Sequence, residues 1–572
     1  MSLTMATATA QISETATEAV RNMGLGWNLG NTLDANSQKI TDVSTDGYWG
    51  QQGLESETCW GQPYTHSELF AMLKNGGFGA IRIPVTWYNH MDKDGNIDAD
   101  WMARVHEVVD YVIDEGLYCI INSHHDTGAD SDTFTSWLKA DETIFSNNKQ
   151  RYEDMWKQIA EEFRDYDEHL LFEAYNEMLD VKSSWCYASF NTKNNYDATI
   201  SASAYNAINS YAQSFVETVR ATGGNNATRN IIVNTYAASN GYGSWSTHLT
   251  DPLTKMALPN DSIAGHLIFE VHTYPSIATT NSQGTTVDRS ISAIRSEVDG
   301  IIKVAKQHLV SKGAPVIFGE WGTSNVDSGT GKTDYDVRRN LMLQFVEYFV
   351  KQAKANDMAV FYWMGISDGL YRNMPAFSQP DLAKTMAKAY HGDDFEGDYP
   401  DGSQIESYTC FEGDKLLEWG NGINIAGSLF EMIGSTAQLE LTYQRTGASD
   451  DIQLYYGDWS SKPSFFVEGN TFNGDFSPSN YYHTATGTEH TTVFTFSNGV
   501  MSNIYQKGLI IHGNKIRVSK AVVTTPEASG IGVILANKDE NAIYDLQGRR
   551  LHAATLTPGI YVQGSGRKFV VK

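Results

Sequence analysis

Basic residues and cysteine are both scarce in this sequence of 572 residues. Its 42 lysines and arginines stand against 68 aspartates and glutamates, which gives a formal net charge of -26. Because general affinity for nucleic acid depends on basic patches, this balance argues against a nucleic-acid partner. The four cysteines show none of the short paired spacings of a zinc site. Cys59 and Cys186 lie in loop-like sequence, and the sequence does not decide whether they pair.

Long apolar runs are missing as well. No stretch of about 18 apolar residues occurs, so we expect no membrane span. The first six residues, MSLTMA, lack both the basic and the apolar region of a secretion signal. We therefore interpret residues 1–20 as an N-terminal segment outside the first domain, in which residues added for expression replace a native leader.

Aromatic residues, in contrast, are abundant. Phe, Trp and Tyr make up 12% of the chain, with 13 Trp and 30 Tyr, and hydrophobic residues reach 41%. This composition indicates a globular protein, and the length predicts two or more domains. Aromatic faces suit flat apolar ligand surfaces, and the acidic balance suits neutral or cationic ligands.

Eight short apolar segments alternate with amphipathic helical patterns between residues 24 and 392. This alternation is typical of βα units around a parallel sheet. Eight such units predict a (β/α)8 barrel with long loops. The predicted strands are residues 24–31, 78–84, 117–122, 170–178, 230–234, 267–274, 315–321 and 359–363.

Polar or aromatic side chains stand at the ends of six of these strands. Each has a structural interpretation by itself, such as an ordinary ion pair, a buried histidine or a core aromatic. Their shared position favours function, because the carboxyl ends of barrel strands meet on one face. These residues are Arg82, His124, Asn176, Glu177, His272, Tyr274, Glu320 and Trp363.

Two glutamates, Glu177 and Glu320, are predicted to face each other across the barrel mouth. A glycosidic bond can be cleaved by two carboxyl groups that flank a cleft, one protonated and one ionised. Arg82 would keep one of them ionised, and Asn176 would bind a sugar 2-hydroxyl. His272 and Tyr274, two residues apart on one strand, would orient the carboxylates, and Trp363 would offer a flat face to a pyranose ring.

The adjacent pair His124 and His125, followed by Asp126, invites comparison with a metal site. Successive residues of a regular strand point to opposite faces, so we expect the two imidazoles to diverge. Without a third convergent ligand, we expect hydrogen bonding to sugar or carboxylate, with no metal and no cofactor.

The motifs at these strand ends resemble glycoside hydrolase family 5 over about residues 20–392. The resemblance implies that Glu177 is the general acid/base and Glu320 the nucleophile of a retaining double displacement. It also implies that Asn28 and the other strand-end residues support the site. The matching motifs are residues 26–32 (GWNLGNT), 81–85 (IRIPV), 124–125 (HH), 175–177 (YNE), 272–274 (HTY) and 319–321 (GEW).

Residues 26–32 together with residues 57–61 (ETCWG) resemble the bacterial endoglucanase branch, subfamily 4. This implies a polysaccharide substrate among the β-glucans, namely cellulose, mixed-linkage glucan or xyloglucan. A β-mannanase or a xylanase on the same scaffold is the alternative. The loop tryptophans Trp60, Trp137 and Trp245 are candidate sugar platforms, and equally candidate loop anchors.

The pattern changes after the barrel. Residues 393–404 are acidic with glycine and proline, which predicts a linker. Short alternating segments over 405–524 predict a β-sandwich, a candidate carbohydrate-binding module. Residues 525–572 form short strands and resemble the small C-terminal β-domain of exported Bacteroidetes proteins. We therefore expect a monomer that is secreted or held at the surface of a Gram-negative cell.

Overall fold

The structure, a computed structural model, describes most of the chain. The described residues are 12–36, 53–130, 136–189, 196–402, 407–427, 430, 437–446, 451–463, 465–467, 470–471, 490–496, 498–524, 543–544, 550–551, 559–563 and 568–571. The chain divides into two compact units, Met1–Gly402 and Ser403–Lys572. Each unit is described by itself.

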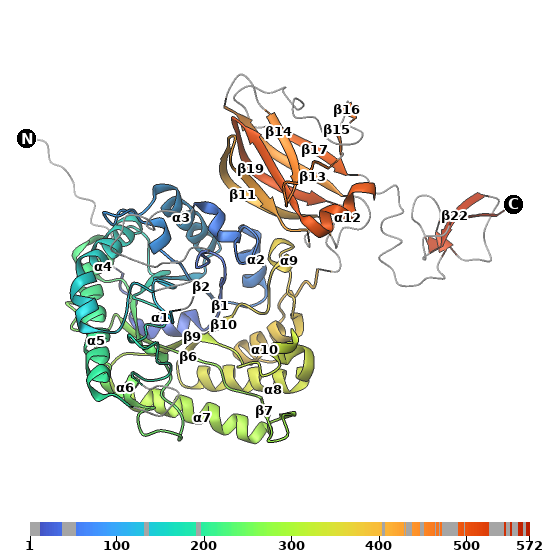
Figure 1. The fold of residues 1–572 in the computed structure, drawn as a ribbon. Coiled ribbons are helices and arrows are strands. Elements are labelled where there is room, and N and C mark those ends of the chain that lie inside the picture. The colour runs from blue at the N-terminus through green and yellow to red at the C-terminus, as the bar shows by residue number, and fades with distance from the viewer. Residues whose placement is uncertain are drawn as a thin grey trace, which may run out of the picture. The chain divides into compact units, whose positions relative to one another are not determined.

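The first unit contains a closed barrel of eight parallel strands, in the order β1-β10-β9-β6-β5-β4-β3-β2 (Figure 1). This confirms the predicted fold, and each strand overlaps one predicted segment. The strands are β1 (Leu25–Asn28), β2 (Ala80–Ile83), β3 (Tyr118–Asn122), β4 (Leu170–Glu173), β5 (Ile231–Ser239), β6 (Leu267–Thr273), β9 (Val316–Trp321) and β10 (Ala359–Trp363).

Amphipathic helices surround the barrel (Figure 1). In α3, for example, Val105, Val108, Val109 and Val112 are buried at helical spacing, and Asp98 caps the N-terminus. Among the described residues, no helix is both long and apolar enough to span a membrane. The helices are α2 (Glu68–Asn75), α3 (Ala99–Asp114), α4 (Glu142–Glu162), α5 (Ala198–Ala221), α6 (Asp251–Lys255), α7 (Ile291–His308), α8 (Asp334–Ala355), α9 (Leu370–Asn373) and α10 (Pro380–His391).

The barrel interior is apolar at one end. Helix α1 (Ala16–Met23) begins with a capping box between Thr15 and Glu18. Its residues Ala16, Ala19 and Val20 pack in one buried cluster with inward residues of seven barrel strands. The predicted domain boundary after residue 20 therefore falls inside a helix that packs against the barrel core. Residues 1–11 lie outside the described residues.

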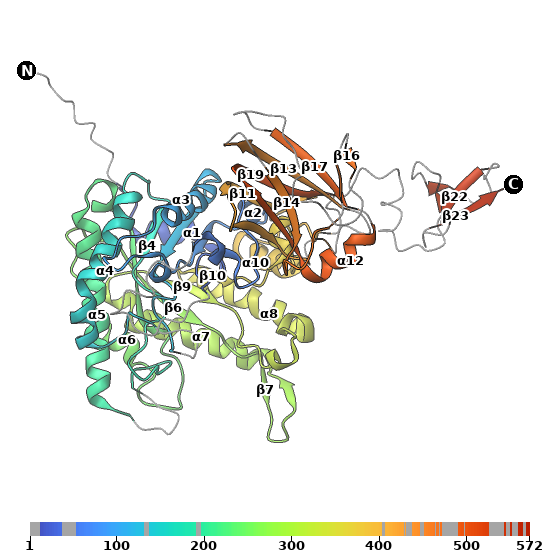
Figure 2. The same ribbon diagram turned by 45° about the horizontal axis from the view of Figure 1, so that its top comes forward.

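Two further features belong to this unit. A hairpin of β7 (Ala278–Thr280) and β8 (Thr286–Asp288) follows β6 (Figure 2). The stretch 393–402, predicted as part of a linker, packs against the barrel unit. Its Phe395 ring stacks on His391, and Tyr399 contacts the ring of Phe377. Cys59 and Cys186, whose pairing the sequence leaves open, are both free thiols.

The second unit is built mainly of antiparallel strands. Six strands form one sheet in the order β11-β19-β13-β17-β15-β16, and three form another in the order β12-β18-β14. The predicted sandwich of these sheets stays a prediction, and helix α12 (Asn498–Lys507) is an element that the sequence pattern did not indicate. The strands are β11 (Ser407–Leu417), β12 (Gly422–Ile425), β13 (Gln438–Arg445), β14 (Asp451–Tyr456), β15 (Phe465–Val467), β16 (Asn470–Thr471), β17 (His490–Phe496), β18 (Leu509–Asn514) and β19 (Ile516–Thr524).

The C-terminal residues form a four-stranded sheet in the order β21-β20-β22-β23. Its short strands agree with the strand pattern read from the sequence. They are β20 (Ile543–Tyr544), β21 (Arg550–Leu551), β22 (Gly559–Gln563) and β23 (Lys568–Val571).

Candidate active site

Strand register brings the polar residues to one level at the carboxyl end of the barrel. Asn28 of β1 is opposite Arg82 of β2 on one side and Trp363 of β10 on the other. His272 of β6 is opposite Glu320 of β9, just after an irregularity in their pairing. Such irregularities are common beside active sites, where they re-aim side chains. The apolar cluster fills the opposite end of the barrel, so these groups collect at its mouth.

Arg82 is the hub of this network. Its Nε donates to Glu173 Oε2 at 2.6 Å, and its Nη2 donates to Glu173 Oε1 at 2.8 Å and to Asn176 Oδ1 at 2.9 Å. Its Nη1 donates to Asn28 Oδ1 at 3.0 Å and to Glu320 Oε1 at 2.9 Å. All five N–H groups of the buried guanidinium are therefore used, a pattern that lysine does not reproduce.

Sequence reasoning missed the main partner of Arg82, which is Glu173. The Glu173 carboxylate also accepts from the amides of Asn122 at 3.0 Å and Asn234 at 3.2 Å. Burial alone would raise the pKa of Glu173, but the Arg82 cation outweighs it and leaves that pKa below its usual value. The signal was present in the sequence, since a glutamate inside a buried apolar strand requires a partner.

A second missed carboxyl group is Glu270 on β6. Its Oε1 lies 3.4 Å from Arg82 Nε and 3.2 Å from His272 Nε2. Burial and the neighbouring Glu173 carboxylate raise the pKa of Glu270 to about 8. Among the described residues no donor reaches Glu270 Oε2. A hydrogen bond with Glu270 helps to lower the pKa of Glu173, which agrees with Glu270 being the protonated member of the pair.

Glu320 has a donor on each oxygen. Arg82 Nη1 reaches its Oε1, and the Tyr274 hydroxyl donates to its Oε2 at 2.8 Å. His272 Nδ1 lies 3.6 Å from the same Oε2. Burial raises the pKa of Glu320, while the cations His272 and Arg82 oppose that rise. This carboxyl group is thus buried but surrounded by groups that favour its ionised form.

His272 connects three carboxyl groups. Its Nδ1 lies 2.8 Å from Glu177 Oε1, and its Nε2 contacts Glu270. Burial alone would lower the pKa of His272, but Glu320, Glu177 and Glu270 together raise it to about 10. A chain of groups therefore leads from the buried Glu270 through a cationic imidazole to the part-exposed Glu177.

Glu177 and Glu320, the two glutamates singled out in the sequence, lie close together. One oxygen of each and one nitrogen of His272 all lie within 4.8 Å of one another. Retaining glycosidases hold their carboxyl groups about 5–5.5 Å apart, whereas inverting ones leave room for a water at about 6.5–9.5 Å. The arrangement favours the retaining geometry.

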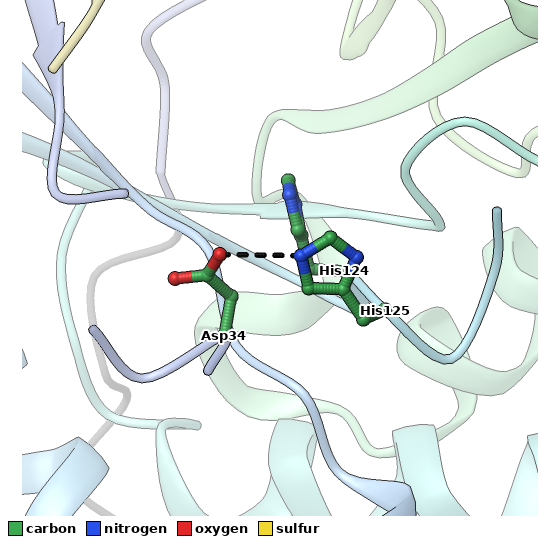
Figure 3. Close-up of side chains that lie close together, drawn as sticks. All are labelled: Asp34, His124 and His125. Carbon is green, nitrogen blue, oxygen red and sulfur yellow. Dashed lines mark ion pairs between the residues drawn. The ribbon is translucent and has the colours of Figure 1, made fainter. Parts of the chain in front are cut away.

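The two adjacent histidines depart from the expected geometry. Strand β3 ends at Asn122, so strand alternation does not apply to His124 and His125. Their rings lie 4.6 Å apart and nearly perpendicular, and His125 Nε2 is 3.4 Å from Asp34 Oδ2 (Figure 3). Ligand atoms of all three lie within 4.8 Å of one another. Burial lowers the pKa of His124, so it is a neutral hydrogen-bonding group, and the absence of a metal stays a prediction.

The tryptophans divide into surface and buried positions. The Trp363 ring is parallel to that of His124 with 5.9 Å between centroids, and His124 Nε2 in turn lies 3.9 Å from Glu320 Oε1. Trp60 is 41% exposed and contacts the ring of His125, and Trp245 is 62% exposed. Trp137 is 2% exposed, and its indole N–H donates to Asp126. It therefore anchors a loop and has no face open to a sugar, contrary to its candidacy as a platform.

The barrel region of the chain is similar to known proteins. The family model described as cellulase (glycosyl hydrolase family 5) matches residues 33–369. Endoglucanase A of Clostridium longisporum is 32% identical over 358 residues, which cover 61% of this chain and 59% of that relative. The chain thus spans about six tenths of that relative's length.

Solved structures are similar over the same region. A GH5-4 broad-specificity endoglucanase from an uncultured bacterium is 56% identical with a TM-score of 0.61, covering 67% of this chain and 97% of that one. A family 5 enzyme of Prevotella bryantii, in complex with a xyloglucan tetradecasaccharide, is 39% identical with a TM-score of 0.55. That match covers 67% of this chain and all of the other.

Proposed function

Because the chain belongs to the cellulase family, glycosyl hydrolase family 5, we propose that it is an endo-acting β-1,4-glucanase that retains anomeric configuration. The observation that carries this proposal is the close approach of Glu177 and Glu320 around His272, within 4.8 Å. The spacing favours direct attack by a carboxylate over attack by a water held between two carboxyl groups.

In the first step, Glu320 attacks the anomeric carbon while Glu177 gives its proton to the glycosidic oxygen. The carbon–oxygen bond breaks, one sugar chain leaves, and the other stays as an ester on Glu320. Arg82 and Tyr274 hold the attacking carboxylate in place through hydrogen bonds to its two oxygens. The cationic His272 stabilises negative charge on Glu177 once that group has lost its proton.

In the second step, Glu177 takes a proton from water, the water oxygen attacks the anomeric carbon, and Glu320 leaves as a carboxylate. Asn176 is held by Arg82 through its Oδ1, and its Nδ2, which lies 3.4 Å from His124 Nε2, has a second N–H for a sugar 2-hydroxyl. Trp363 offers an aromatic face beside the reacting carbon. Most of these side chains are held by contacts between strands that are not adjacent in the barrel, such as that of Arg82 on β2 with Glu320 on β9.

The proposed substrates are β-glucans, with cellulose, mixed-linkage glucan and xyloglucan as the polymers to test first. The xyloglucan oligosaccharide bound to the P. bryantii enzyme supports a cleft that accepts branched chains. Because a polymer of this kind does not enter a cell, we propose that the enzyme works outside the cytoplasm.

The decisive test is a pair of variants on a substrate panel. Glu320→Gln is expected to lower turnover at least about a thousandfold while leaving oligosaccharide binding largely intact. Glu177→Gln is expected to lose less activity on an aryl glycoside with a good leaving group than on a glucan, because such a leaving group needs little protonation. Proton NMR of the first-formed product reports its anomeric configuration.

The panel contains cellulose, mixed-linkage glucan, xyloglucan, mannan and xylan, with chain-length analysis of the products. Hydrolysis confined to mannan or xylan would replace the glucanase assignment by a mannanase or a xylanase. An inverted first-formed product, or near-parental activity of Glu320→Gln, would contradict the mechanism itself.

A further inference from the structure

An aromatic cluster lies on the three-stranded sheet of the second unit. We call Trp419, Tyr455, Trp459 and His512 the aromatic platform. The His512 ring lies 5.3 Å from Trp419, 5.3 Å from Trp459 and 5.6 Å from Tyr455, measured between centroids. Tyr455 and Trp459 are themselves 4.9 Å apart. Four rings from three separate segments of the chain thus form one surface.

The platform occupies the face of the sheet opposite its aliphatic core. Ile452, Leu454 and Ile511 are buried and alternate along β14 and β18 with residues of the other face. On that other face His512 is directly opposite Gln453, and the Tyr455 hydroxyl donates to Gln453 Oε1 at 3.1 Å. The ammonium group of Lys462 lies 4.6 Å from the Tyr455 ring centroid. Polar side chains therefore contact the Tyr455 side of the platform and hold it in place.

Exposed large apolar side chains are found at this platform. Among the described residues of the second unit, the exposed large apolar side chains are Trp419 at 55% and Trp459 at 50%. Trp459 also has a positive φ of 57°, a backbone conformation that is unfavourable for a bulky side chain. His512 Nδ1 is buried without a hydrogen-bond partner among the described residues. Backbone strain and unsatisfied polar atoms tend to gather at binding sites.

We propose that the aromatic platform binds a neutral β-glucan chain, separately from the active site. Pyranose rings stack on exposed Trp faces and on the part-exposed Tyr455 ring beside them. The net charge of -26 disfavours an anionic polysaccharide. The choice of a glucan rests on the proposed function of the barrel, because both units belong to one chain. The platform would hold the enzyme on its substrate between cuts and raise the local concentration of chain near the cleft.

The test uses the full chain carrying Glu320→Gln, which prevents hydrolysis, in native gels containing barley mixed-linkage glucan. Adding Trp419→Ala together with Trp459→Ala is expected to weaken retardation about tenfold, the size of one strong contact. The double Phe variant keeps aromatic faces and is expected to stay within about threefold of the parent. Arg517→Ala, which removes an exposed ion pair with Asp414 on the other sheet, is the matched control and is expected to change nothing.

Thermal unfolding establishes that each variant is folded, and Trp419→Ala alone carries the test if the double Ala variant is not. Equal retardation of the parent and the Ala variants would contradict glucan binding at the platform. So would a loss of self-association in the Ala variants, measured by sedimentation, with glucan retardation unchanged. With Glu320 intact, hydrolysis of a short soluble cello-oligosaccharide is expected to be the same with and without the platform. If neither the parent nor the platform variant hydrolyses this oligosaccharide, the proposed function is wrong. The gel result then still tests glucan binding at the platform.

Discussion

Glu270 is held between two cations, Arg82 and His272, next to the carboxylate of Glu173. A protonated Glu270 leaves the ionised Glu173 and Glu320 to balance those two cations, which keeps the buried network near neutrality. This matters because an uncompensated charge in a buried site costs several kcal/mol. We therefore interpret Glu270 as a positioning residue that acts through His272 on Glu177.

A pair of substitutions at this position tests its protonation. Glu270→Gln has a carbonyl to accept from His272 and an amide to donate to Glu173, so kcat on mixed-linkage glucan is expected to stay within about threefold of the parent. Glu270→Ala leaves His272 without that support and is expected to lower kcat about tenfold, with little effect on KM. Equal damage by Gln and Ala would mean that an ionised carboxylate is required here.

The raised pKa of Glu270 predicts how the stability of the fold changes with pH. The folded-state pKa of Glu270 is raised from 4.5 to about 8. Its contribution to stability is therefore fully present below about pH 4.5 and is lost as pH rises towards 8. Compared with Glu270→Gln, the parent is expected to lose melting temperature between pH 5 and pH 8. Differential scanning calorimetry of both proteins across this range measures the difference, and parallel pH profiles would contradict it.

At the scale of the strand, β9 depends on a glycine beside Glu320, the proposed nucleophile. A Cβ at Gly319 would lie 1.4 Å from Glu270 Oε1, so Glu270 must move if any side chain is added. Gly319→Ala is expected to destabilise the fold by about 3 kcal/mol or more and to disturb the contacts of Glu270. Gly322→Ala is the matched control, because its Cβ would meet only the Tyr274 ring, at 3.5 Å. Urea unfolding of the two variants compares them directly, and similar midpoints would show that Glu270 relaxes easily.

The strands themselves were predictable from local pattern. An apolar run such as residues 170–172 indicates a buried strand, and its repetition eight times with helices between indicates the barrel. The helix α1 was not predicted, although its sequence carries signals for it, namely the capping box between Thr15 and Glu18 and buried residues at helical spacing. The end of β3 at Asn122 was predicted, but strand alternation was still applied to His124 and His125 beyond it, so their close approach was missed.

At the scale of the whole molecule, the division at Gly402 predicts that the barrel unit folds alone. A chain ending at Gly402 keeps every residue of the active site. It is expected to hydrolyse a soluble cello-oligosaccharide within about twofold of the full-length rate and to bind barley glucan more weakly in native gels. Circular dichroism and the two assays measure this, and an insoluble or inactive shortened chain would show that the units depend on each other.

The sequence by itself determined the barrel, its eight strand ends and the two glutamates, because apolar periodicity and strand-end position are local properties of the chain. Only the tertiary structure decided which groups those residues meet. The fork of Arg82 faces Glu173 as well as Glu320, Glu270 lies behind His272, and Trp137 turns inward. Such choices depend on register between strands far apart in the chain and on which faces the loops cover. A single sequence shows neither the register nor the faces that loops cover, because each strand could pair with more than one other strand before the barrel has formed.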